Sequence, residues 1–99
     1  MCEQAANADE LTPKFAFGQI VATPKALTAV ANDDILNALS RHLQGDWGLL
    51  DTHDWNVNEQ ALKHGGRLFS SYRSSQNVTF WIITEADRSA TTILLPEDY

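Results

Sequence analysis

The chain has 99 residues, of which 43% are hydrophobic and 9% aromatic, and this is the length and composition of one globular domain. Thirteen Asp and Glu residues against seven Lys and Arg residues give a net charge of −6 at pH 7. This acidic balance makes direct nucleic-acid binding an unfavourable interpretation, because such binding uses Lys and Arg to displace phosphate counterions. It is compatible with a basic protein partner.

The sequence shows no targeting signal and cannot form an internal disulfide. No stretch approaches the roughly 20 apolar residues of a membrane span, and the N-terminus lacks the basic and apolar regions of a secretory signal. Cys2 is the only cysteine, so no internal disulfide can form. We therefore expect a cytoplasmic protein that does not enter a membrane and holds no cofactor.

Residues 1–14 are polar and lack periodicity, which predicts a flexible leader, and residues 15–99 are expected to form a single domain. Residues 15–22 alternate as a strand does. Thr23 and Pro24 then begin a short helix, with Thr as N-cap and Pro at the first helical position.

Two longer helices are expected next. Asp33 and Asp34 place carboxylates at the positive end of a helix that Gly45 terminates. Asp51 or Thr52 caps another helix that runs to about residue 64. The apolar stripe of the earlier helix consists of Ile35, Leu36, Leu39 and Leu43, and the inner face of the later one of Trp55, Asn58, Ala61 and Leu62.

From residue 67 the hydrophobic period changes to two, which predicts strands over residues 67–73, 78–84 and 90–95. Short polar connections at residues 74–77 and 85–89 favour hairpins. The sequence therefore predicts an α+β fold of order β-α-α-α-β-β-β: an N-terminal strand, two to three helices, and a three-stranded antiparallel meander with the helices packed on one face. The first strand could join either edge.

Residues 78–83 are apolar on both faces of their predicted strand. Because the helices cover one face of the sheet, the leader or a second copy of the chain must cover the other. We expect a homodimer that buries roughly 800 Å² per partner.

The turn Asp46-Trp47-Gly48 has two interpretations. Trp47 could be an exposed anchor for a partner. Alternatively, Asp46 bonds the N–H groups of its own turn while Trp47 fills the core between the second and third helices, and we favour this structural role. Asp46 and Trp47, with Asp87 and Arg88 of the last turn, are the candidate binding residues.

Catalytic motifs are absent from the sequence: there is no Gly-x-Ser-x-Gly elbow and no glycine-rich phosphate loop. His42, His53 and His64 lack the spacing of metal ligands, so no metal site is expected. The remaining polar residues permit a metal-independent ribonuclease or toxin of the barnase and RelE type. Its catalytic residues would be Glu85 as base, His64 as acid, and Arg67 and Arg88 as the phosphate clamp.

The structural alternative for these residues is simpler. Asp87 and Arg88 would close their own hairpin turn, and Glu85 would pair with Arg67 across strands.

Four segments, residues 18–24, 45–48, 61–65 and 81–96, resemble a family of small bacterial proteins that occur on plasmids and integrative elements. Members are commonly labelled "plasmid-related protein" or "type I restriction endonuclease subunit M". Lys25 and Leu49 depart from the family pattern, which has Gly and Asp there. The chain lacks a methyltransferase motif of the Asn-Pro-Pro-Tyr kind and is several-fold too short for that domain. The resemblance therefore implies only an association with mobile elements.

We expect a non-enzymatic, acidic binding or regulatory protein of a mobile element that acts through a protein partner. A host-defence inhibitor is one special case, and mimicry of DNA by carboxylates is one way for it to act. The ribonuclease is the alternative. The carboxylates that could support mimicry are Asp33, Asp34, Asp46, Asp51 and Asp54.

Overall fold

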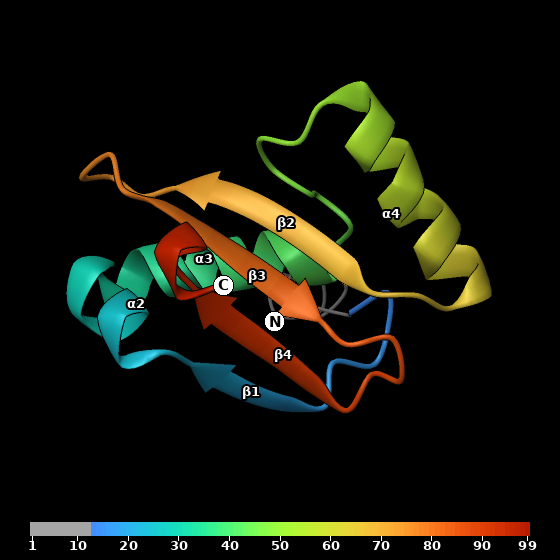
Figure 1. The fold of residues 1–99 in the computed structure, drawn as a ribbon, viewed down its shortest axis with the longest axis horizontal. Coiled ribbons are helices and arrows are strands. Elements are labelled where there is room, and N and C mark those ends of the chain that lie inside the picture. Colours follow the sequence, from blue (N-terminus) through green and yellow to red (C-terminus); the bar gives the residue numbers. More distant parts are fainter. Residues whose placement is uncertain (1–12) are drawn as a thin grey trace, which may run out of the picture.

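The computed structural model of the chain describes residues 13–99 and shows an α+β fold (Figure 1). The predicted order of one strand, three helices and three strands is confirmed. In chain order the elements are β1 (Gln19–Ala22), α2 (Pro24–Ala29), α3 (Asn32–Leu43), α4 (Thr52–His64), β2 (Leu68–Arg73), β3 (Thr79–Thr84), β4 (Ala90–Leu94) and a short 3₁₀ helix, η1 (Pro96–Asp98).

The four strands form one sheet in the order β1-β4-β3-β2. Strands β2, β3 and β4 make the predicted antiparallel meander. Strand β1 joins the outer edge of β4 and runs parallel to it, so the sheet is mixed. This direction is possible because the helices between β1 and β2 provide the long crossover that parallel strands require.

Strand β1 is shorter than predicted, since it begins at Gln19 and not at residue 15. The cause is Gly18, whose φ of +61° breaks the extended conformation. A Cβ on Gly18 would lie 2.2 Å from the carbonyl oxygen of Ser89, so the chain turns here in close contact with the β3–β4 turn. Of the predicted leader, residues 1–12 lie outside the described residues, and the Lys14 N–H donates to the Leu43 carbonyl at 2.9 Å.

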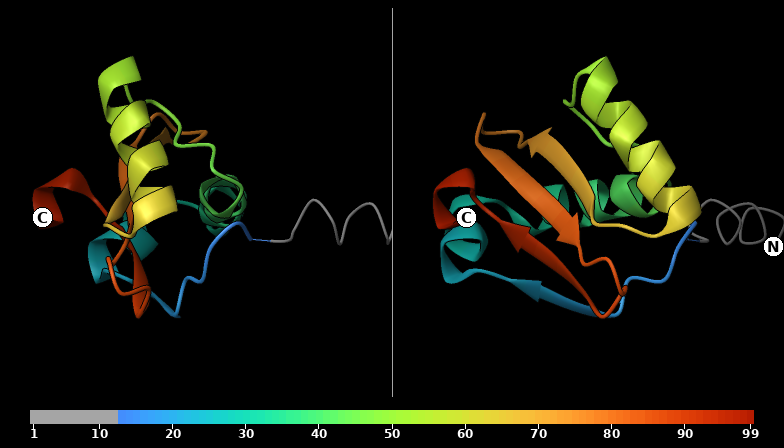
Figure 2. Two further views of the ribbon diagram at one scale, coloured as in Figure 1. Left: turned by 90° about the vertical axis from the view of Figure 1, so that its right-hand side faces the viewer. Right: turned by 45° about the vertical axis from the view of Figure 1, so that its right-hand side comes forward.

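Helix α3 packs on one face of the sheet, and α2 lies at the end of β1 and β4, where its Ala26 joins the same core (Figures 1 and 2). The core contains residues from both helices, from β2, β3 and β4, and from the adjoining positions 30 and 95: Ala26, Val30, Ile35, Ala38, Tyr72, Phe80, Ile82, Ile93 and Leu95. Within residues 13–99, no helix has the length and apolar character needed to cross a membrane.

Helix α4 lies along the outer edge of β2, and not over the face where α3 packs (Figures 1 and 2). The Asn58 side chain bonds the backbone of Phe69 on both sides, donating to its carbonyl and accepting from its N–H. Of the predicted inner face, only Asn58 is buried, and the other three residues are half-buried. Next along the edge, Ser71 exchanges backbone bonds with the segment 47–49. The edge of β2 is therefore covered at two places, by Asn58 of α4 and by the segment 47–49.

Candidate binding face and polar clusters

The side of the sheet opposite α3 is called the open face here, and of residues 13–99 the short helix η1 lies on this side, near the end of β4 (Figure 2). Alternation along the strands places Phe69, Trp81, Ile83 and Leu94 on this side. Val21 of β1 lies opposite Thr92 and shares this face. Ile83 and Leu94 are buried, Phe69 and Trp81 are half-buried, and Val21 is 39% exposed. The open face thus has an apolar cluster that is only partly covered.

A hollow of about 240 Å³ lies in the open face, lined by Arg67, Phe69, Trp81, Ile83 and Tyr99. The Trp81 ring contacts Phe69 and Tyr99 edge to face, with centroids 5.0 and 5.9 Å away. Arg67 donates a hydrogen bond to the Tyr99 hydroxyl, and its guanidinium lies 5.4 Å from the centre of the Tyr99 ring. These contacts give the hollow a defined shape, with an aromatic wall and one cation at its rim.

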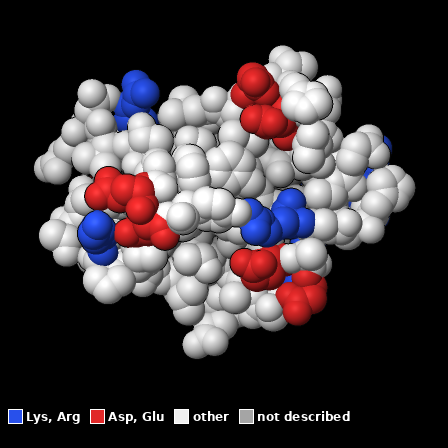
Figure 3. Space-filling view, in the orientation of Figure 1, with Lys and Arg blue, Asp and Glu red and all other residues white. Residues whose placement is uncertain are grey.

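Charged side chains on the open face gather in a few separate groups with uncharged surface between them (Figure 3). The β3–β4 turn contributes the exposed Glu85 and Asp87, and η1 contributes the exposed Glu97. Glu97 is paired with Lys25 at 3.7 Å. Carboxylates therefore lie both at the end of β3 and at η1, with the aromatic hollow between these two elements.

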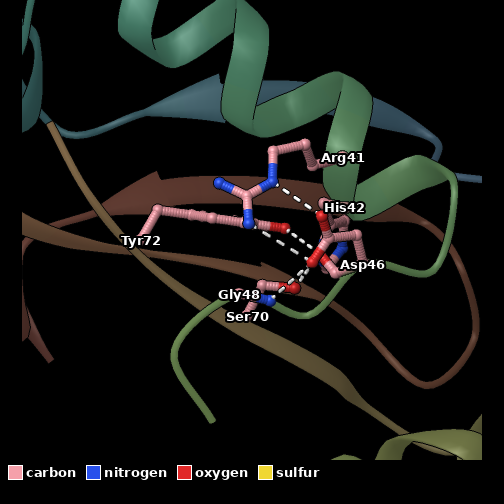
Figure 4. A network of polar contacts seen from close by, with 6 residues as sticks. All are labelled: Arg41, His42, Asp46, Gly48, Ser70 and Tyr72. Carbon is pink, nitrogen blue, oxygen red and sulfur yellow. Dashed lines mark hydrogen bonds and ion pairs between the residues drawn. The ribbon is translucent and has the colours of Figure 1, made fainter. Parts of the chain in front are cut away.

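The Asp46-Trp47-Gly48 turn has the structural role predicted for it (Figure 4). Trp47 is fully buried, so it is not an exposed anchor, and its indole N–H donates to Glu59 Oε2 at 2.8 Å. Asp46 Oδ1 accepts from the Gly48 N–H at 3.1 Å. Asp46 also forms an ion pair with Arg41, at 2.8 Å between Oδ2 and Nε. The hydrogen bond from Arg41, and then that from Gly48, lowers the pKa of the Asp46 carboxyl.

His42 is fully buried and forms part of a chain of hydrogen bonds through the core. Its Nδ1 lies 2.5 Å from Ser70 Oγ, and its Nε2 lies 2.9 Å from Thr84 Oγ1. Thr84 Oγ1 is 2.8 Å from Thr91 Oγ1, and the Thr91 hydroxyl donates to the Phe17 carbonyl. This last bond determines the donor and the acceptor in each of the other hydrogen bonds, because a carbonyl oxygen can only accept.

Because the Thr91 hydroxyl donates its hydrogen to the Phe17 carbonyl, Thr91 Oγ1 accepts from the Thr84 hydroxyl, and Thr84 Oγ1 accepts from His42 Nε2–H. Nδ1 of His42 is then the acceptor for the Ser70 hydroxyl. Burial lowers the pKa of His42 to about 3, so the ring is neutral at physiological pH. Both His42 and Ser70 are fully buried, so this pair cannot reach a substrate.

The sequence was used to assess His42 only as a metal ligand, and its burial was not predicted. A signal was present, because His42 follows Ile35 and Ala38 at helical spacing and all three are the buried residues of α3.

Arg88, which was proposed for the ribonuclease, and its neighbour Asp87 form hydrogen bonds within the fold. Arg88 donates to four carbonyl oxygens, those of Ala61, Gly66, Glu85 and Ala86. Asp87 accepts from the Ser89 N–H at 3.0 Å, and bonding to Ser89 lowers the pKa of the Asp87 carboxyl. The prediction that these two residues close their own turn is confirmed.

The predicted pair between Glu85 and Arg67 is wrong. Within the described part of the chain these two side chains form no ion pair, and Arg67 contacts Tyr99 instead. Glu85 and His64 are both exposed. Among residues 13–99, no three His, Cys, Asp or Glu side chains converge on a position where a metal could bind.

Comparison with protein-family models, with curated proteins and with solved structures gives no match to this chain.

Proposed function

We propose that this chain is a non-enzymatic binding protein and that a protein partner docks on the open face at the hollow around Trp81. The observation that carries the proposal is the set of side chains in the hollow: Trp81, Tyr99 and Arg67 are of the three residue types that dominate binding energy at protein interfaces. Their ring contacts hold them in place before a partner arrives, which lowers the entropy lost on binding.

The chemistry of the hollow indicates the kind of partner. Its volume of about 240 Å³ suits one large apolar side chain, which would enter between the rings of Phe69 and Tyr99. The carboxylates of Glu85, Asp87 and Glu97 lie beyond it, and the net charge of the chain is −6. We therefore propose a partner that presents an apolar anchor flanked by Lys or Arg residues.

The resemblance to mobile-element proteins suggests that this partner is a host protein, and a component of host defence is one candidate. Mimicry of DNA is the weaker version of this idea. Asp34 accepts two hydrogen bonds from Ser75, Asp46 is paired with Arg41, and Asp51 caps α4. Carboxylates committed to such local bonds are less available to imitate a row of phosphates.

The ribonuclease is not favoured, because its proposed clamp would need Arg88. The guanidinium of Arg88 already bonds four backbone carbonyls, and binding a phosphate would break these bonds. The polar pair that resembles a catalytic dyad, His42 and Ser70, is buried.

The test is a capture experiment followed by a measured affinity. Immobilised wild-type protein is exposed to bacterial lysate, a retained protein is purified, and its binding is measured by calorimetry. Tyr99→Ala and Arg67→Glu should each weaken binding at least tenfold, because Tyr99 is 69% exposed and both residues line the hollow.

Leu36→Ser is the matched control, since Leu36 is a 62% exposed apolar residue of α3, on the other side of the sheet. Equal affinity of wild type, Tyr99→Ala and Arg67→Glu for the captured protein would rule out the open face as the docking site. Binding that is lost in Leu36→Ser and kept in Tyr99→Ala and Arg67→Glu would also rule out the open face as the docking site.

A further inference from the structure

The two edges of the sheet are treated in opposite ways. The outer edge of β2 is covered by Asn58 and by the segment 47–49. Within residues 13–99, no segment pairs with the outer edge of β1. Strand β1 has only four residues, Gln-Ile-Val-Ala, and apart from this short length it lacks the features that normally protect an edge from pairing: it has no charged residue, no proline and no bulge.

The backbone groups that face outward from β1 can be identified from its bonds to β4. The Gln19 N–H donates to Ser89 and the Thr23 N–H donates to Ile93, so the odd-numbered residues of β1 face β4. Ile20 and Ala22 therefore direct their N–H and C=O groups away from the sheet. The Ile20 side chain is 43% exposed, which leaves the approach to this edge uncrowded.

We propose that two copies of this chain pair through β1, antiparallel, to make one sheet of eight strands. A second copy supplies an edge with the same two outward residues, so every donor on one strand meets an acceptor on the other. The pairing is independent of any partner at the open face.

The geometry selects a single register. With the two-fold axis at Val21, Ile20 lies opposite Ala22 of the other copy, and each such pair exchanges two hydrogen bonds. An axis at Ile20 would place Ala22 opposite Gly18, whose φ of +61° has already ended the strand. An axis at Ala22 would place Ile20 opposite Pro24, which has no N–H and begins α2. Only the axis at Val21 uses all the outward groups.

The proposed dimer has a consequence for the open face. A two-fold axis perpendicular to the sheet keeps both open faces on the same side. Val21 points to this face and would meet its own copy at the axis, so the two open faces would form one side of the eight-stranded sheet. The dimer expected from the sequence would have covered this face, whereas pairing through β1 leaves both hollows accessible.

The register predicts a specific cross-link. In an antiparallel sheet the residues opposite each other at Val21 form a non-hydrogen-bonded pair, with Cα atoms about 4.5 Å apart, which a disulfide can bridge. In a Cys2→Ser background, Val21→Cys should give a disulfide-linked dimer under mild oxidation at about 100 µM protein. Thr92→Cys is the matched control on the same face, since two further strand spacings of about 4.8 Å place its copies too far apart to bridge.

A second measurement addresses the hydrogen bonds themselves. Sedimentation of wild-type protein should show the mass rising from 11.0 kDa towards twice that value as concentration increases. Ile20→Pro removes an outward N–H that makes no bond to β4, so it should keep the thermal transition of the fold and weaken dimerisation at least tenfold. A wild-type protein that stays at 11.0 kDa up to 500 µM, or a Val21→Cys variant that cross-links no more than Thr92→Cys, would overturn the proposal.

Discussion

The guanidinium of Arg88 donates to the carbonyl oxygen of Ala61 at 3.2 Å, and so joins the β3–β4 turn to the last turn of α4. The Ala61 carbonyl also accepts from the Gly65 N–H at 2.9 Å, and a cation near the C-terminal end of a helix is favourable. Arg88 also bonds Gly66, beyond the helix, and two carbonyls of its own turn. The backbone of Arg88 has a φ of +62°, a conformation that residues other than glycine rarely adopt. Arg88 thus ties the C-terminal end of α4 to the β3–β4 turn.

Arg88→Ala is therefore expected to lower the free energy of unfolding by about 2 kcal/mol, because charge-assisted bonds to α4 and the turn are lost. Arg88→Gly loses the same bonds but relieves the backbone, and should recover about 1 kcal/mol of that loss. Urea denaturation measures both values. Equal stability of Arg88→Ala and wild type would show that the guanidinium does not hold α4 in place.

The buried His42 predicts a dependence of stability on pH. The folded pKa of about 3 lies below the ordinary value of 6.5, so between these values the unfolded chain binds a proton that the folded chain does not. Stability from this group is complete above pH 6.5 and is lost as the pH falls towards 3. The expected loss is about 2 kcal/mol between pH 7 and pH 5, measured by urea denaturation at each pH.

His42→Gln should flatten this slope between pH 7 and pH 5. His53→Gln and His64→Gln, at exposed positions of α4, are the controls and should leave it unchanged. NMR of the ring nitrogens should report the neutral form with its proton on Nε2. A slope that persists in His42→Gln would contradict the assignment of the pH dependence to His42, and a proton on Nδ1 would contradict the direction derived for the hydrogen bonds.

The residues that sequence reasoning placed correctly are those with local signals. Thr23 with Pro24, and Asp51, cap their helices as predicted, because N-cap chemistry depends on residues three positions away or fewer. The period-two pattern after residue 67 likewise gave β2, β3 and β4.

What the sequence did not predict depends on contacts between distant residues. Strand β1 begins only after Gly18, which lies against the Ser89 carbonyl. His42 is buried where it bonds hydroxyls on β2 and β3. The hollow required Tyr99 to meet Trp81, and no sequence period relates these two positions. The candidate site was therefore the least predictable part of the molecule, whereas the element order was the most predictable.

Two glycines with similar φ angles should respond differently to substitution. Gly48 has φ +78°, and a Cβ there would lie 2.1 Å from the Ser71 carbonyl oxygen. Gly65 has φ +82° and nothing within 4 Å of the added atom. Gly65→Ala should therefore lower the free energy of unfolding by about 1 kcal/mol through the backbone alone.

Gly48→Ala adds a clash that forces the segment 47–49 away from β2, and should lower it by about 3 kcal/mol or more. Thermal unfolding measures the difference, at roughly 4–8 °C per kcal/mol for a domain of this size. Equal shifts in the two variants would mean that the segment moves without resistance, and that its pairing with Ser71 contributes little.

Asn58 provides the last test, because one side chain replaces a neighbouring strand at the edge of β2. It is 3% exposed and satisfies both backbone groups of Phe69, with distances of 2.5 Å to the carbonyl and 3.1 Å from the N–H. Asn58→Ala should lower the free energy of unfolding by about 3 kcal/mol, since two shielded backbone groups lose their partner. Asn56→Ala, at an exposed position of the same helix, should change it by less than about 0.5 kcal/mol.

Amide hydrogen exchange locates the effect of this substitution. In Asn58→Ala the Phe69 N–H should exchange much faster than in Asn56→Ala, relative to amides of β3 in the centre of the sheet. The Ser71 N–H, which donates to the Trp47 carbonyl at 3.3 Å, should keep more of its protection because its partner is untouched. If Phe69 and Ser71 lose protection equally, the edge of β2 opens as one unit and the two covering devices are not independent.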